Sequence, residues 1–249
     1  MQALLFGSIG TLVETSELQR QAFNQAFEDA SVGWHWSKQA YQDMLTISGG
    51  QNRLRYYAKQ RNQPLGEADI RELHQRKSKH FQDVLNAGIE LRPGVSRLIA
   101  EAREHGVKLG FVSTTSRANI EAIAAGVDAL SLTDFDVVTS ADNVSESKPH
   151  PQVYQYACQT LGVRPEYAVA IEDTAVSLQA ARAANIICIA TPGDYTSEQD
   201  FSEAQAVFEQ LGTDNKPGNV IRTEFAFEQT YVDINWLSKL LQKSQGIFA

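Results

Sequence analysis

Residues 168–190 read AVAIEDTAVSLQAARAANIICIA, and they carry the clearest structural pattern in the chain. The stretch opens on a short apolar run, Ala168 to Ile171, and closes on a second one, Ile186 to Ala190. Each run has the length and composition of a buried strand, and the residues from Ala175 onward are typical of a helix. A strand, a helix and a strand in this order predict a right-handed crossover between two parallel strands.

The same alternation continues upstream to Leu91. Apolar runs at 107–112 and 137–138 predict two more strands, and helices are expected from Val95, Arg117 and Pro151. Strands alternating with helices of this length indicate a doubly wound, Rossmann-like α/β core with a parallel sheet.

One further buried strand is expected at Ala3 to Phe6, far from the others in the sequence. Residues 16–88 separate it from them and carry only helical patterns and turns. We therefore expect an all-helical cap domain over residues 15–90, inserted into a core domain made of residues 1–14 and 91–249. Beyond residue 190 we predict loops and turns, and then an amphipathic helix over Ile234 to Leu241.

Composition narrows the classes of function. The chain has 249 residues, a net charge of −8 and a pI near 5.2, and such an acidic surface repels nucleic acid. No run approaches the ~18 apolar residues of a membrane span, and the start MQALLFG lacks the basic segment of a secretory signal. We expect a cytoplasmic protein with no membrane partner, in which Cys158 and Cys188 are buried free thiols.

Ligands in doubly wound sheets bind at the carboxyl ends of the strands. Small residues follow the first strand, from Gly7 to Val13, and either permit close backbone approach to a ligand or form a plain tight turn. Ser113 and Thr114 follow the strand that ends at Val112, where they either help hold an anion or cap the next helix.

Two charged positions complete this set. Lys148, held by a following proline, either aims its ammonium into a pocket or lies on the surface. Glu172 and Asp173 follow the strand that ends at Ile171, and paired carboxylates there suit a hard cation. The alternative is that Asp173 only caps the next helix.

The order and spacing of these segments resemble the haloacid-dehalogenase-like superfamily, in its β-phosphoglucomutase-like branch, and are most similar to CbbY-like sugar-phosphate phosphatases. The motifs that carry the resemblance span about residues 3–211 and are GTLVETSELQRQAFNQAF, TISGGQNRLRYY, LRPGV, FVSTTS, SKPHPQVY, AIEDTAVSLQAARAAN and TPGDYTSEQDF.

The chain departs from this family at the first motif, Asp-x-Asp-Gly-Thr. The resemblance places the nucleophilic aspartate at Gly7 and the acid/base aspartate at Ile9, so both groups are lost. Glycine has no nucleophilic atom and isoleucine transfers no proton. Ser8 is the nearby hydroxyl, but its side chain should point opposite to those of residues 7 and 9.

The resemblance also implies a magnesium site and an anion site. The carbonyl of Ile9 and the side chain of Asp173 remain as metal ligands, with Glu172 in a position to hold a ligating water, but loss of the residue-7 carboxylate should leave Mg²⁺ binding weak or absent. Ser113 and Lys148 match the family's phosphate-binding positions, with Thr114 beside them. Without acidic groups at residues 7 and 9, Lys148 should have fewer negative neighbours.

In the cap, Thr15 and Arg53 match substrate-facing positions of the family. Arginine is a natural bidentate ligand for a second phosphate. The alternative is that Arg53 and nearby Arg55 are solvated helix residues.

Three functions stay open at this point. The first is a pseudo-phosphatase that binds a small phosphorylated sugar, or an inorganic anion, without hydrolysing it. The second is a weak or altered Mg²⁺-dependent phosphohydrolase. The third is an interaction protein with a vestigial pocket, whose protein partner the sequence does not reveal.

Overall fold

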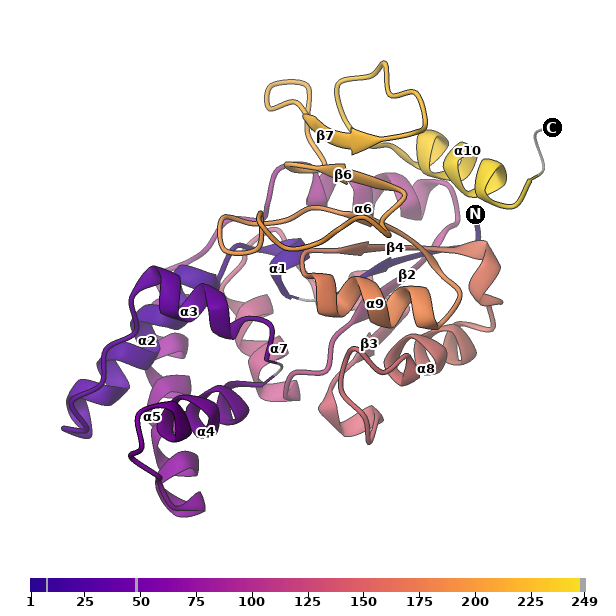
Figure 1. The fold of residues 1–249 in the computed structure, drawn as a ribbon. Helices are drawn as coiled ribbons and strands as arrows, with labels where there is room; N and C mark the ends of the chain where they lie inside the picture. Colours follow the sequence, from indigo (N-terminus) through magenta and orange to yellow (C-terminus); the bar gives the residue numbers. More distant parts are fainter. Residues whose placement is uncertain (8, 48, 247–249) are drawn as a thin grey trace. The chain divides into compact units, whose positions relative to one another are not determined.

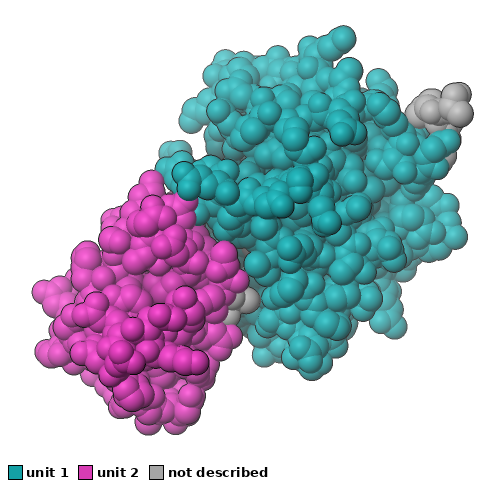
Figure 2. All heavy atoms as spheres, viewed as in Figure 1, with its two compact units in different colours: residues 1–14, 90–249 teal, residues 15–89 magenta. Residues whose placement is uncertain are grey.

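The computed structural model describes residues 1–7, 9–47 and 49–246, which form two compact units (Figures 1 and 2). One unit comprises residues 1–14 and 90–249, and the other comprises residues 15–89. We call them the core unit and the cap unit and describe each by itself.

The core unit contains a seven-stranded sheet in the order β3-β2-β1-β4-β5-β6-β7. The strands are β1 (Ala3–Phe6), β2 (Lys108–Val112), β3 (Val137–Thr139), β4 (Ala168–Glu172), β5 (Ile187–Ala190), β6 (Ala206–Phe208) and β7 (Val220–Thr223). Every pairing is parallel except that of β6 with β7. The expected α/β fold with a parallel sheet is confirmed.

Helices cover both faces of this sheet (Figure 1). They are α1 (Ile9–Leu12), α6 (Val95–Glu104), α7 (Arg117–Ala125), α8 (Gln152–Leu161), α9 (Ala175–Ala183) and α10 (Ile234–Ser244), with 3-10 turns at Leu132–Asp134, Ala141–Asn143 and Pro165–Tyr167. The helices α8 and α9 pack against each other on one face, and α10 packs on α6. The central strands β1 and β4 are completely buried, which explains their unbroken apolar sequences.

Strands β6 and β7 were not predicted. Strand β6 has only three residues, too few to show a periodicity, and β7 mixes polar and apolar residues on an exposed edge. The final helix was predicted, and its apolar side, which includes Trp236 and Leu240, is buried. Cys158 and Cys188 are free and buried, as expected.

The described residues of the cap unit form four helices, namely α2 (Ser16–Asp29), α3 (Lys38–Met44), α4 (Gly50–Gln60) and α5 (Glu67–Leu85). Helix α5 packs along α2 and α4. Trp36 lies at the centre of the unit, with its ring 4.5 Å from that of Phe23 and 4.9 Å from that of Phe27. These rings form the aromatic part of the buried core of this unit. No helix among the described residues of either unit is long and apolar enough to cross a membrane.

Candidate active site

The predicted site residues of the core unit gather where β1, β2 and β4 end. Strand β1 lies between β2 and β4, so the residues that follow these three strands share one edge of the sheet. The backbone N–H of Gly7 donates to the carbonyl of Ile171 at 2.9 Å, which holds the end of β1 beside Glu172.

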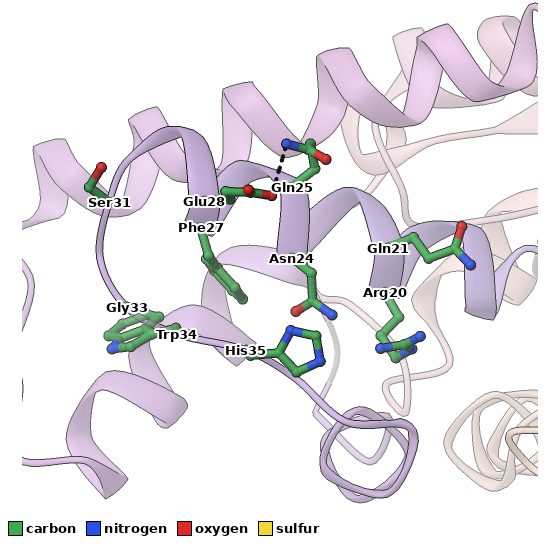
Figure 3. A pocket seen from close by; sticks show the side chains of 10 residues that line it. All are labelled: Arg20, Gln21, Asn24, Gln25, Phe27, Glu28, Ser31, Gly33, Trp34 and His35. Carbon is green, nitrogen blue, oxygen red and sulfur yellow. Dashed lines mark hydrogen bonds between the residues drawn. The ribbon is translucent and has the colours of Figure 1, made fainter.

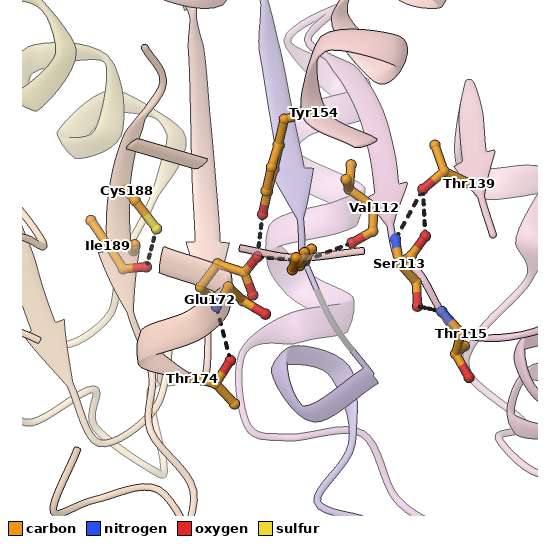
Figure 4. Close-up of polar contacts among 11 residues, drawn as sticks. Val112, Ser113, Thr115, Thr139, Tyr154, Glu172, Thr174, Cys188 and Ile189 are labelled. Carbon is orange, nitrogen blue, oxygen red and sulfur yellow. Dashed lines mark hydrogen bonds and ion pairs between the residues drawn. The ribbon is translucent and has the colours of Figure 1, made fainter. Parts of the chain in front are cut away.

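A buried ion pair occupies this edge (Figure 4). The Nζ atom of Lys148 donates to Oε1 of Glu172 at 2.7 Å and to the carbonyl of Val112 at 3.1 Å. The side chains of Lys148 and Glu172 are 4% and 0% exposed, so Lys148 is not a surface lysine. The hydroxyl of Tyr154 donates to the same Oε1 atom. Lys148 thus has a direct negative neighbour in Glu172, although residues 7 and 9 are not acidic.

Burial shifts the pKa values of Glu172 and Tyr154. It raises the pKa of Glu172 above its ordinary value, although the neighbouring Lys148 ammonium lowers it in part. Burial and the nearby Glu172 carboxylate raise the pKa of Tyr154 well above 10. Tyr154 therefore stays protonated and remains a hydrogen-bond donor to Glu172 at neutral pH.

Glu172 lies in the space that a side chain at residue 7 would need. A Cβ atom built on Gly7 would be 2.1 Å from both Cδ and Oε1 of Glu172, whereas carbon atoms in contact lie about 3.5–4.0 Å apart. A Cβ atom on Gly10 would similarly be 1.8 Å from Oδ2 of Asp173. Glycines at residues 7 and 10 thus allow both carboxylates to lie against the first loop.

Ile9 opens the short helix α1, so the chain after β1 is not extended there. Side chains alternate in direction only along an extended chain, so the expected direction of Ser8 does not follow from this geometry. Ser8 itself lies outside the described residues. At the return from the cap, Arg92 fixes this loop by donating to the carbonyl of Gly10 at 3.0 Å and to that of Pro192 at 2.9 Å.

Ser113 is buried at the end of β2. Its N–H donates to Oγ1 of Thr139 at 3.0 Å, and its Oγ accepts from the N–H of Thr115 at 3.1 Å. Ser116, whose Oγ accepts from Asn119, caps α7 instead. The capping alternative for Ser113 and Thr114 is therefore wrong, and Thr114 is half-buried beside Ser113.

The residues present do not fit a magnesium site. Mg²⁺ prefers an octahedral shell of oxygen ligands that includes one or two carboxylates. The Glu172 carboxylate is bonded to Lys148 and Tyr154, and Asp173 is the second acidic residue at the end of β4. Within the described ranges, no group of three or more His, Cys, Asp or Glu side chains could hold a metal ion. The alternative that Asp173 caps α9 is also wrong, because Thr174 is the cap residue.

The predicted cap residues belong to the cap unit. Thr15 is buried and precedes α2, with its Oγ1 atom 3.5 Å from the amide nitrogen of Gln19. The Nε atom of Arg53 donates to the carbonyls of Met44 and Ile47, so Arg53 is not simply a solvated residue. Arg55, in contrast, forms an exposed ion pair with Glu67.

Two buried polar residues, Lys77 in the cap unit and Tyr154 in the core unit, were not predicted from the sequence. Lys77 of α5 is 3% exposed, donates to Oε1 of Gln19 at 2.5 Å and lies 4.7 Å from the ring centre of Phe81. Its position in the apolar stripe between Leu73 and Phe81 was a signal that it is buried. Tyr154 gave no such signal, because a tyrosine on the apolar side of α8 is typical of a core residue.

A cavity of about 710 Å³ also lies within the cap unit, between α2 and the segment 31–35 (Figure 3). Phe27 and Trp34 line it together with Arg20 and Asn24, whose side chains donate to the carbonyl of Trp36. None of the predicted site residues lines this cavity.

Comparison with known proteins gives a consistent result. The model of the haloacid dehalogenase-like hydrolase family matches residues 9–191. Protein CbbY of Cereibacter sphaeroides is 38% identical in an alignment of 219 residues, and the match covers 85% of this chain and 94% of that protein.

Solved structures agree with the fold. CbbY from Rhodobacter sphaeroides, solved in complex with phosphate and, as a mutant, with xylulose-(1,5)bisphosphate, has a TM-score of 0.79 at 37% identity. The match covers 84% of this chain and 94% of that one. A β-phosphoglucomutase from Clostridium difficile has a TM-score of 0.76 over 99% of both chains, and at 16% identity it supports the fold alone.

Proposed function

This chain belongs to the haloacid dehalogenase-like hydrolase family, among its CbbY-like sugar-phosphate phosphatases, and on that premise we propose that it binds a small phosphorylated sugar without hydrolysing it. The observation that carries the proposal is the residue pair Gly7 and Ile9 at the end of β1, where the family's first motif has two aspartates. The chain would then be a pseudo-phosphatase that acts as a sensor or regulator.

Gly7 and Ile9 lack the two groups that phosphate hydrolysis in this family needs. A phosphoryl group needs an attacking atom, and glycine has none; the leaving oxygen needs a proton, and isoleucine supplies none. Loss of a nucleophile costs several powers of ten in rate, and loss of an acid/base costs about 10²–10⁴. The Glu172 carboxylate is no substitute nucleophile, because it is completely buried and hydrogen-bonded to Lys148 and Tyr154.

The groups suited to an anion are retained. An ammonium has three N–H donors, and among the described residues Lys148 donates to Val112 and Glu172, so its third donor can serve a phosphate oxygen. Ser113 and Thr114 directly follow β2, the strand that ends at Val112. The relative from Rhodobacter sphaeroides binds phosphate and a sugar bisphosphate, which supports a ligand of the same class here. We derive no step through Mg²⁺, since the residues present do not fit it.

Binding is tested by calorimetric titration of inorganic phosphate and xylulose 1,5-bisphosphate in EDTA. The wild-type chain is compared with Lys148→Met and with Lys239→Met, which removes an exposed lysine on α10. Loss of a charge-assisted hydrogen bond should weaken binding at least about tenfold in Lys148→Met. Lys239→Met should bind as the wild type does, and equal binding by all three proteins would refute the role of Lys148.

Catalysis is tested by phosphate release from sugar mono- and bisphosphates, with Mg²⁺ and with EDTA. We expect no turnover by the wild type, with Mg²⁺ or with EDTA. Turnover by the wild type that requires Mg²⁺ and disappears in Asp173→Asn would instead favour the weak phosphohydrolase. Absence of ligand binding and of turnover in every protein would favour the interaction role.

A further inference from the structure

Lys148 is a buried lysine and therefore needs a counter-ion. An ammonium that is 4% exposed and has no carboxylate beside it would be strongly destabilising, because removal of one partner leaves an uncompensated buried charge. Strand β1 supplies no carboxylate here, since Gly7 and Ile9 follow it. Among the described residues, the acidic side chain that forms an ion pair with Lys148 is that of Glu172, at 2.7 Å.

The position of the Glu172 carboxylate is tied to the glycine at residue 7. A Cβ atom on Gly7 would be 2.1 Å from Cδ and 2.4 Å from Oε2 of Glu172. Tyr154 and Lys148 both hold Oε1 in this place, so the carboxylate cannot move aside without loss of two hydrogen bonds. A side chain at residue 7 and this arrangement of Glu172 therefore exclude each other.

We infer that Glu172 is the internal counter-ion of the anion site, in the place that an acidic residue 7 would otherwise fill, and that it limits how tightly the site binds phosphate. The part that concerns phosphate rests on the proposed function. A phosphate that approaches Lys148 meets a neutral pair rather than a cation, and it is repelled by the Glu172 carboxylate. The expected ligand affinity is thus lower than a buried lysine alone would give.

The first test is a double-mutant cycle measured as thermal unfolding in EDTA. Gly7→Asp introduces a second carboxylate into the space of the first, and Glu172→Gln leaves Lys148 without a counter-ion. Each should lower the melting temperature by about 5 °C or more. In Gly7→Asp/Glu172→Gln the new aspartate pairs with Lys148, so the double variant should melt above both single variants.

This comparison is decisive even where a single variant does not fold. A double variant that folds when a single one does not is the expected rescue. A double variant that melts at or below the lower of the two single variants, or that does not fold, overturns the inference. Glu166→Gln, which removes an exposed carboxylate, is the matched control and should melt as the wild type does.

The second test is titration with inorganic phosphate in EDTA. Glu172→Gln should bind phosphate about tenfold more tightly than the wild type, whereas Glu166→Gln should not differ from it. Unchanged affinity in Glu172→Gln would refute the effect on the ligand. If no variant binds phosphate, the proposed function and the ligand part of this inference fail together, whereas the thermal cycle still decides whether Glu172 replaces an acidic residue 7.

Discussion

Lys77 allows a quantitative prediction about pH. It is buried in α5 with its ammonium bonded to Gln19, and it lies 5.2 Å from the ring centre of Phe23. Burial, and secondarily the charge of Arg53, lowers the pKa of Lys77 from its ordinary 10.5 to about 7. Between these two pH values the unfolded chain binds a proton that the folded cap unit does not.

The sign of the effect follows from this difference. Stability rises with pH wherever the unfolded state binds more protons, so the cap unit should become more stable as the pH rises from 7 toward 10.5. One pH unit within this window corresponds to at most about 1.4 kcal/mol. Between pH 7 and pH 9 the expected gain is about 2 kcal/mol. Lys77→Met fills the same space without a charge and should lack this gain.

The assay is urea denaturation of both proteins at pH 6, 7 and 9, followed by hydrogen–deuterium exchange of peptides from residues 15–89. Other titrating groups contribute equally to both proteins, so the difference between them isolates Lys77. We expect Lys77→Met to be more stable than the wild type at pH 6, with the difference decreasing at pH 9. The same pH dependence in both proteins would refute the reasoning.

Three further substitutions test packing and hydrogen bonding. Gly7→Ala should lower the free energy of unfolding by about 1–3 kcal/mol through overpacking against Glu172. The control Gly66→Ala, at φ −67° and near an exposed carboxylate, should lower it by less than about 1 kcal/mol. Urea denaturation measures both values. Arg92→Met should cost at least about 2 kcal/mol, because the carbonyls of Gly10, Pro192 and Glu209 lose their donor, and an unchanged denaturation midpoint would contradict this. Asp233→Ala should cost about 1 kcal/mol, since its side chain caps α10 at Trp236, and the increase in hydrogen exchange should be confined to α10.

The sequence predicted the core sheet well for a physical reason. Strands such as Ala3–Phe6 and Ala168–Glu172 are buried on both faces, so their composition alone distinguishes them from loops. Strand β7 lies at the sheet edge, and its Ile221 is 59% exposed. Such a strand is defined by its pairing with β6, and a pairing partner cannot be read from a local pattern.

The candidate site was predicted only in part. The identities of Gly7 and Ile9 can be read from the sequence, and so can the presence of Lys148 and Glu172. The direction in which Glu172 points could not be predicted, because it depends on the empty space beside Gly7 and on the hydroxyl of Tyr154. We expected Glu172 beside a metal ion, and the structure instead has it bonded to Lys148.

The central place of β1 has a consequence for the order in which the chain is made. Ala3 pairs with Lys108 on one side and with Ala168 on the other. At about 5–20 residues per second, a ribosome that has made the first strand needs roughly 10–30 s more to make its second partner. Throughout that time the run Ala3–Phe6 has an unpaired edge, while the cap unit, whose residues 15–89 are all made well before β4, can already fold. Nascent chains should therefore need protection of the run Ala3–Phe6 for longer than of any later strand.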